Sequence, residues 1–405
     1  MLQSYQGEWH MTTRHAAISG ASIAGLSAAF WLRRTGWEVT VLERAEAFRD
    51  GGQNVDVRGT AREVLTRMGL FDAVKDQNTT ETGTVFVDSS GRVLAELPDA
   101  GPDGATAELE VLRGDFAATI LHNLPDGVEI VYGDTVSGVE DGPEHVTVST
   151  AAGRHLRADL LVIAEGVRSA TRDLLFGDLV ERRDLGVAMV FGTIPRTASD
   201  DTRWRWYTTT GGRQVHLRPD NHGTTRAMLA CTGDFGGLGR ADALSRFRDR
   251  YAGAGWETRR VLDGFDDSED VYVDQLTQIR MPAWHRGRVC LAGDAAWCVT
   301  PMGGGGASLA LISGYVLAAA TAAPGRLEDG LAAYEDWMRP LVDDVQNFPG
   351  WLLRFAYPRT RFGLRLRRLA DRVFTSRLLA PLTAKMTQVA SSERALPPVE
   401  SVRAG

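Results

Sequence analysis

The sequence predicts an α/β fold in which a mainly parallel, Rossmann-like sheet is interrupted by an antiparallel sheet and followed by helices. Three observations support this prediction. A strand, a glycine turn, a helix and a second strand open the chain; residues 185–280 are rich in β-segments; and a buried strand returns at RVCLAG, from Arg288. The opening reads as a βαβ unit, whereas strands separated by turn signals such as TGGR and PDNHG are typical of an antiparallel sheet.

The opening unit carries the segment GASIAG, which fits the dinucleotide pattern GxGxxG except at its second glycine position. Gly20 permits a tight turn, the small Ser22 lets the backbone approach a pyrophosphate, and Gly25 lets the helix pack closely on the strand. Glu43 ends the second strand, where a carboxylate can accept hydrogen bonds from ribose hydroxyls. The pattern favours FAD or NAD over NADP; a glycine turn that serves packing alone is the alternative.

Further along the chain we expect a helix near Thr60–Met68, short strands at TVFVD and RVLAEL, a helix from Arg113 to about Leu124, and four strands between VEIVYG and DLLVIAEG. A helix around Ala241–Tyr251 interrupts the β-rich segment. The parallel-sheet domain is therefore predicted over 14–80, 107–181 and 281–348, the antiparallel-sheet domain over 81–106 and 182–280, and terminal helices over 349–405.

A second glycine-rich motif, RVCLAGDAAWCVTPMGGGGAS, follows the returning strand. The strand delivers Asp294 at its end, and successive glycines expose backbone NH groups before a helix of small residues. Such a nest suits a phosphate or the polar edge of a ring. A flexible turn with a helix cap is the alternative interpretation.

Composition excludes several classes of protein. The net charge of −7 argues against a dedicated nucleic-acid binder, because such a protein needs a basic patch to displace counterions. Three cysteines and eight histidines show no disulfide-framework or metal-ligand spacing, so no metal is predicted. No signal peptide or long apolar run is evident, so we expect a cytoplasmic protein without stable membrane insertion.

Three motifs together resemble a known family. GASIAG with ERA, DLLVIAEGVRSATR, and GDAA with PMGGGG are similar, in order and spacing over about residues 14–345, to the fingerprints of the FAD-dependent aromatic hydroxylases. These are the para-hydroxybenzoate hydroxylase-like group A flavoprotein monooxygenases. The resemblance implies FAD as cofactor, NADPH or NADH as reductant, and transfer of one oxygen atom from O2, through a flavin C4a-hydroperoxide, to an aromatic or polycyclic, polyketide-like small molecule.

The resemblance also assigns roles to individual positions. It places the FAD pyrophosphate at Gly20, Ser22 and Gly25, and the adenosine at Glu43 and Arg44. The residues it places beside the ribityl chain and the flavin ring are Arg113, Asp294, Pro301, Gly303, Gly304, Gly305 and Gly306. Three departures from the family pattern are Glu165 in place of Asp, Trp297 in place of His, and Gly305 in place of Gln.

The antiparallel segment resembles that of the tetracycline-inactivating monooxygenases at HLRPDNHG. By that match the substrate-facing residues are Arg205, Tyr207, His216, Arg226 and Met228. His216 is the candidate base and Arg205 a candidate catalytic residue, while Trp297 is either a packing residue or a wall of the substrate pocket. The alternative is that the hairpin residues are simply one surface of a sheet.

Several alternatives remain open from the sequence alone. The same cofactor supports Baeyer–Villiger oxidation, epoxidation or N-oxidation, and an oxidase or reductase without oxygen insertion, or a non-catalytic binding protein, also fits. A monomer or homodimer is expected. The arginine-rich terminal segment is interpreted as helices that pack on the protein rather than on a membrane surface, because Phe362, Leu364, Leu366 and Leu369 do not form one stripe at helical spacing.

Overall fold

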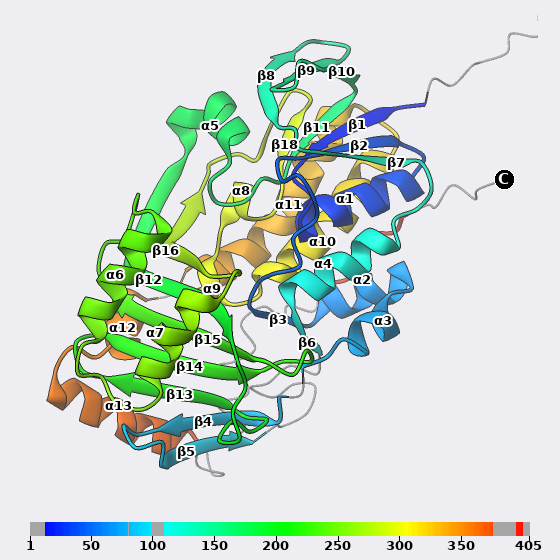
Figure 1. The fold of residues 1–405 in the computed structure, drawn as a ribbon. Helices are drawn as coiled ribbons and strands as arrows, with labels where there is room; N and C mark the ends of the chain where they lie inside the picture. The colour runs from blue at the N-terminus through cyan, green and yellow to red at the C-terminus, as the bar shows by residue number, and fades with distance from the viewer. Residues whose placement is uncertain (1–12, 80, 99–108, 348, 376–393, 400–405) are drawn as a thin grey trace, which may run out of the picture.

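The computed structural model describes residues 13–79, 81–98, 109–347, 349–375 and 394–399. The expected terminal helices over 349–405 therefore lie partly outside the described residues, as does most of the segment 99–106. Within the described ranges, two sheets of different character lie side by side, each with its own helices (Figure 1). No helix among these residues is long and apolar enough to cross a bilayer.

The first sheet is six-stranded and parallel apart from one edge strand. In spatial order its strands are β17 (His285–Arg286), β18 (Val289–Leu291), β11 (Leu160–Ile163), β1 (His15–Ser19), β2 (Glu38–Glu43) and β7 (Val128–Tyr132). Its helices are α1 (Ile23–Arg34), α2 (Thr60–Met68), α3 (Phe71–Lys75), α4 (Arg113–His122), α10 (Gly306–Ala322) and α11 (Leu327–Gln346). Because β1 and β18 are followed directly by glycine turns, the two motifs of the sequence meet at the carboxyl edge of this sheet.

Helices α1 and α10 approach each other closely because of small residues. A Cβ atom at Gly314 would lie 2.4 Å from backbone atoms of Ser27 and Ala28. The Ser27 hydroxyl donates to the carbonyl of Leu311 on α10 at 2.6 Å. The two motifs are thus held in a fixed relation by a helix pair that has no room for a side chain at this contact.

Smaller elements complete this half of the molecule. They are a three-stranded sheet of β8 (Val136–Asp141), β9 (Val146–Thr150) and β10 (His155–Ala158), a two-stranded sheet of β3 (Asn54–Val57) and β6 (Leu109–Leu112), and the helices α5 (Ala170–Phe176), η1 (Gly177–Leu179), α8 (Asp294–Trp297) and α9 (Thr300–Gly303).

The second sheet has seven strands and is antiparallel except where β13 pairs with β4. In spatial order they are β16 (Tyr272–Arg280), β12 (Glu181–Ile194), β15 (Thr225–Thr232), β14 (Arg213–Pro219), β13 (Trp204–Thr209), β4 (Gly83–Val87) and β5 (Val93–Pro98). One face packs on α6 (Arg240–Tyr251) and α7 (Thr258–Asp267) through a buried apolar core. The other face meets α12 (Gly350–Ala356) and α13 (Arg361–Phe374), and α13 lies in orange at the lower left of Figure 1.

Candidate active site

The first glycine motif forms a tight turn that leaves no room for a side chain at Gly20 or Gly25. Gly20 has φ of +106°, and a Cβ there would lie 2.5 Å from the carbonyl oxygen of Ala164. A Cβ on Gly25 would lie 1.9 Å from the carbonyl oxygen of Gly20. Ser22 is the N-cap residue of α1, because its carbonyl accepts the first hydrogen bond of the helix, from the backbone NH of Leu26 at 2.9 Å. The backbone NH groups that precede Leu26 in the first turn therefore have no acceptor within the helix. This is the geometry that binds a phosphate.

Glu43 lies beside that turn at the end of β2. Its two carboxylate oxygens accept hydrogen bonds from the backbone NH groups of Ala21 and Ala45, both at 2.9 Å. These bonds fix the carboxylate at the edge of the turn and leave each oxygen a further lone pair for a hydroxyl donor. Arg44 follows with an exposed side chain. The pair fits the adenosine end of a dinucleotide.

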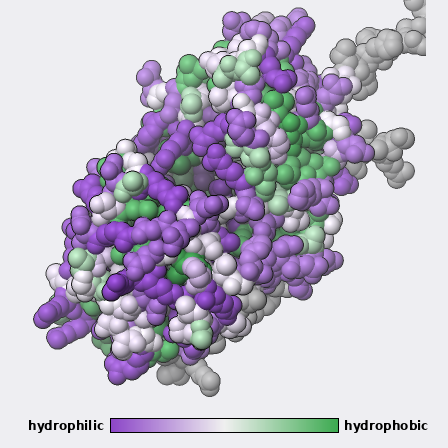
Figure 2. Space-filling model, in the orientation of Figure 1, coloured by the Kyte–Doolittle hydropathy of each residue, from purple (hydrophilic) through white to green (hydrophobic). Residues whose placement is uncertain are grey.

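The second glycine motif faces the first across the carboxyl edge of the sheet. Asp294 begins α8 with an exposed side chain, yet surrounding protein raises the pKa of its carboxyl group by desolvation, while the charge of Arg113 opposes the shift. A side chain that is both accessible and closely surrounded lines a recess. Figure 2 shows a hollow among hydrophilic side chains near the position that α8 occupies in Figure 1.

The backbone between α8 and α10 is strained where a cofactor ring is expected. Thr300 has φ of +63°, an outlier for a β-branched residue, and its buried hydroxyl has no partner among the described residues. Gly304 and Gly305 have φ of +68° and +69°, and α10 begins directly after them at Gly306. The orphaned hydroxyl and the free NH groups of the first turn of α10 are polar groups that fit the edge of a flavin ring.

Glu165, the departure in the middle motif, is engaged entirely by the protein. Its carboxylate accepts hydrogen bonds from the hydroxyls of Ser19, Ser169 and Thr171 and from the backbone NH of Thr171, at 2.5 to 3.0 Å. It therefore ties the end of β1 to the start of α5. Arg172, fully buried, donates to the carbonyls of Val167 and Ala295 and so joins the middle motif to α8. Both residues support the shape of the site rather than offering free groups to a ligand.

The structure separates the five residues expected to face substrate. Tyr207 is buried in the core under α6 and α7, and Arg205 on the same face of β13 is ion-paired with Asp201 at 2.7 Å. His216, Arg226 and Met228 lie on the opposite face of the sheet, because His216 is directly opposite Trp206 rather than Tyr207. The expectation of a single substrate-facing surface is thus not met for Arg205 and Tyr207.

The face that carries His216 presents a continuous row of large side chains, one from each of six neighbouring strands. Cross-strand pairing places these residues in one line, which we name the cross-strand row: Tyr272, Phe191, Met228, His216, Trp206 and Phe86. Rings of Tyr272 and Phe191 stack at 4.9 Å, and those of Trp206 and His216 lie 4.4 Å apart. Four of the six, Tyr272, Phe191, Trp206 and Phe86, were not predicted from the sequence, and the WxW spacing of Trp204 and Trp206 was a signal for Trp206.

One end of the cross-strand row lies near Arg113 and near Asp294 of the second glycine motif. The hydroxyl of Tyr272 donates to the Gln53 side chain, and the carbonyl of Gln53 accepts from the backbone NH of Arg113 at 3.0 Å. Two residues further along β16, the pKa of Asp274 is raised to about 6 by desolvation and by the neighbouring Asp294, although Arg168 opposes the shift. Strand β16 therefore brings the row to the recess that Asp294 lines.

His216 is held as a neutral imidazole. Its Nδ1 accepts from the indole NH of Trp204 at 3.1 Å, so the proton is on Nε2, which donates to Oε1 of Gln214 at 3.2 Å. Burial, reinforced by the charges of Arg218 and Arg367, keeps the pKa of His216 well below its usual value. With its free lone pair engaged, the ring is not placed to accept a substrate proton, which argues against the expected base role.

Arg226 lies on the same face as His216, with its charge already balanced. It pairs with Asp220 at 3.1 Å and Asp270 at 2.9 Å. Directly opposite it, Arg218 pairs with Glu81 and Glu110 and lies 4.0 Å over the ring of Trp204. Both guanidinium groups are thus paired with carboxylates, and neither offers an unpaired positive charge to a ligand beside the cross-strand row.

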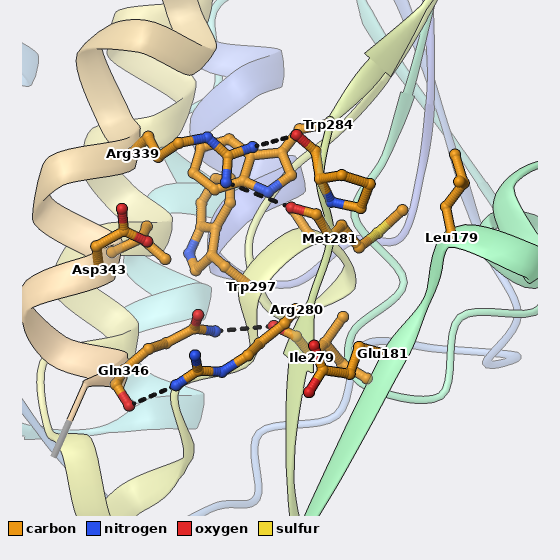
Figure 3. Close-up of a pocket in the computed structure, with 13 residues that line it drawn as sticks. Leu179, Glu181, Ile279, Arg280, Met281, Trp284, Trp297, Arg339, Asp343 and Gln346 are labelled. Carbon is orange, nitrogen blue, oxygen red and sulfur yellow. Dashed lines mark hydrogen bonds between the residues drawn. The ribbon is translucent and has the colours of Figure 1, made fainter. Parts of the chain in front are cut away.

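Trp297 is a packing residue. Its side chain is buried against Trp284, with ring centroids 4.4 Å apart, and near Tyr334. Figure 3 shows it next to Trp284 among the residues that line a pocket of about 360 Å³ between β16 and α11, where Arg339 lies over Trp284. Of the expected site residues, Trp297 alone lines this pocket, and the other cofactor and substrate positions lie elsewhere.

Comparisons with known proteins agree with this geometry. A family model described as "FAD binding domain" matches residues 13–348. An uncharacterized protein of Mycobacterium tuberculosis is 34% identical over 82% of this chain and 93% of its own length. The flavin-dependent monooxygenase eupH of a Phoma species is 34% identical over 88% of this chain and 90% of its own.

Among solved structures, the tetracycline destructase Tet(55) superposes with a TM-score of 0.81 at 26% identity, covering 96% of this chain and 99% of that one. The expected α/β fold and flavoprotein resemblance are thereby confirmed. The chain belongs to the FAD-dependent monooxygenases of the aromatic hydroxylase type.

Proposed function

We propose that this protein uses NAD(P)H and O2 to hydroxylate an aromatic or polycyclic small molecule held between the glycine motifs and the cross-strand row. The observation that carries the proposal is the row itself. Five of its six members have rings, they share one face of the sheet, and the Tyr272 end lies at the recess lined by Asp294. Flat apolar walls of this kind favour planar, aromatic ligands.

The residues present fit FAD at the glycine motifs. Gly20, Ser22 and Gly25 would hold the pyrophosphate at the start of α1, and Glu43 the adenosine ribose, with Arg44 beside it. The residues that would hold the remainder of the cofactor are Arg113, Asp294, Pro301, Gly303, Gly304, Gly305 and Gly306. When bound and reduced, the flavin supplies the oxygen chemistry.

The chain's own groups position the reactants and exclude water. The free NH groups at the start of α10 stabilise negative charge at the adjoining edge of the cofactor. The cross-strand row supplies an apolar surface that orients a planar substrate and limits water beside the reacting atoms. His216 is buried within the row, and Trp204 and Gln214 fix the orientation of its neutral ring.

The names of similar proteins support the class of substrate. Tet(55) is called a tetracycline destructase, and eupH is called a flavin-dependent monooxygenase. A polycyclic, polyketide-like substrate therefore agrees with both the cross-strand row and the names of the relatives. Baeyer–Villiger oxidation, epoxidation and N-oxidation use the same cofactor, and the chemical structure of the product distinguishes each of them from hydroxylation.

The test is anaerobic reduction of the purified, FAD-loaded protein by NADPH and by NADH, with and without a panel of polycyclic phenols, followed by admission of air and mass spectrometry. We expect flavin bleaching that one ligand accelerates and a product heavier by one oxygen atom. Bleaching with hydrogen peroxide as the sole product for every ligand would support an oxidase instead. A protein that binds ligand but whose flavin is never reduced would overturn the proposal.

A further inference from the structure

Helix α13 exposes the side of itself that a packed helix normally buries. Phe362, Leu366, Leu369 and Val373 are 77%, 50%, 58% and 45% exposed. At about 100° per residue, their spacing places all four within about 60° of the helix circumference. They form one continuous apolar stripe, which the expectation from the sequence did not single out because it treated Phe362, Leu364, Leu366 and Leu369 together. Leu364, included in that expectation, lies outside the stripe.

The side of α13 that faces the protein is polar. Arg367 and Asp371 are buried and paired at 2.7 Å. The Arg367 guanidinium lies 5.6 Å from the ring of Trp206 and 5.9 Å from that of Phe86, at the end of the cross-strand row. The helix is thus anchored by a buried ion pair and cation–π contacts, and its orientation with the apolar stripe outward is fixed.

A basic stripe lies beside the apolar one. Arg361, Arg365, Arg368 and Arg372 also fall within about 60°, centred about 100° from the apolar stripe. Three of them are exposed and Arg368 is half-buried. Within the described residues, the ion pair of Arg367 with Asp371 is the one that α13 forms, and the charge of Arg368 also acts on Asp371. Arg361, Arg365 and Arg372 form no ion pair there. On a chain of net charge −7, this is a local concentration of positive charge.

We propose that α13 docks this protein reversibly on the surface of a lipid bilayer that contains anionic lipids. An apolar stripe flanked by arginines is the arrangement by which a helix lies in the plane of a membrane interface, with the apolar side chains among the acyl chains and the guanidinium groups at the phosphates. Helix α12, which packs against α13, adds the exposed Trp351.

The dimensions and the charge favour a membrane over a second copy of the chain. Four side chains along about 16 Å of helix offer far less than the roughly 800 Å² per partner that a stable protein interface buries. In an antiparallel pair of such helices, the two basic stripes would also lie on the same side and repel each other. An anionic surface instead compensates the unpaired arginines and covers the apolar stripe together.

The experiment is flotation of the full-length, FAD-loaded protein with vesicles of phosphatidylcholine alone or mixed with phosphatidylglycerol. We expect binding to the mixed vesicles, weaker binding as salt is added, and little binding to phosphatidylcholine alone. Arg365→Gln with Arg372→Gln should weaken binding about 25-fold, about five-fold for each arginine. Leu366→Ser with Leu369→Ser should weaken it more than about tenfold.

Matched controls lie on other helices. Leu174→Ser replaces a leucine of α5 that is similarly exposed, and Arg259→Gln removes an exposed arginine of α7; neither should change vesicle binding. The arginine variants alter no packed contact, so they remain informative if the leucine variants unfold. Binding that survives both pairs of substitutions would overturn the proposal.

Two further outcomes would also overturn it. One is a concentration-dependent dimer that the leucine variants dissociate, without vesicle binding, which would assign the stripe to a second copy. The other is a wild-type protein that binds no vesicle and whose melting temperature falls in the leucine variants, which would mean that another part of the chain covers the stripe.

Discussion

Replacement of Gly25 by alanine tests whether the first glycine motif is shaped by backbone contact. The new Cβ would lie 1.9 Å from the carbonyl oxygen of Gly20 and 3.1 Å from its carbon. Because both atoms belong to the backbone, no side-chain rotation relieves the clash, and the turn between β1 and α1 must open.

The expected cost follows from two opposing effects. Overpacking costs typically about 1–3 kcal/mol, whereas alanine is favoured over glycine inside a helix by about 1 kcal/mol. The difference is about 0–2 kcal/mol, and because the clash is with backbone atoms we expect a net loss in the upper half of that range, about 1–2 kcal/mol in the free energy of unfolding. Displacement of Gly20 also moves the phosphate-binding NH groups, so FAD affinity should fall by at least about tenfold, equivalent to about 1.4 kcal/mol.

Chemical denaturation of the cofactor-free protein and fluorescence titration with FAD measure the two effects separately. The matched control is Gly350→Ala, at the first residue of α12, where nothing lies within 4 Å of the new Cβ. The control should keep the wild-type FAD affinity and should be as stable as the wild type or more stable by up to about 1 kcal/mol. Wild-type stability and FAD affinity in the Gly25 variant would refute the reasoning.

Three further predictions concern the titratable groups of the site. Asp274→Asn should raise the free energy of unfolding of the cofactor-free protein above pH about 6, by about 1–3 kcal/mol, and change it little near pH 4. The reason is that the raised pKa of Asp274 makes the wild-type protein less stable as pH increases from about 4 to about 6. Urea denaturation as a function of pH measures this difference, and a difference that does not change with pH would contradict the prediction. Glu165→Asp should lower the melting temperature and the FAD affinity together, because the shorter side chain cannot keep all four hydrogen bonds between β1 and α5; an unchanged melting curve would contradict this. His216→Gln should leave the shape of the pH profile of kcat near neutrality unchanged, since the imidazole is neutral there; loss of a limb that the wild type shows near pH 6–7 would instead restore the base role.

The sequence was sufficient to predict the parallel sheet and the turns that carry the glycine motifs, because their determinants are local. Gly20, Gly25 and Glu43 act within one βαβ unit, and the position of each follows from strand, turn and helix alone. The second motif follows a buried strand in the same way. Parallel strands bring such turns to one edge of a sheet, so the meeting of Asp294 with the first motif needed no side-chain detail.

The faces of the antiparallel sheet depend on register, which alternation within a strand does not fix. The hairpin of β13 and β14 pairs Thr209 with Arg213, and this pairing sets Trp206 opposite His216 and leaves Tyr207 on the other face. A loop one residue longer or shorter would reverse the assignment. The apolar stripe of α13 was missed for a similar reason: Leu364 was grouped with residues that lie on another side of the helix.

The most direct test of the central claim is turnover of the FAD-loaded protein with NAD(P)H under isotopically labelled O2. Mass spectrometry should find one labelled oxygen atom in an aromatic or polycyclic product, with the other atom in water, for each NAD(P)H oxidised. Stoichiometric labelled hydrogen peroxide without labelled organic product, across a broad panel of planar substrates, would contradict the account.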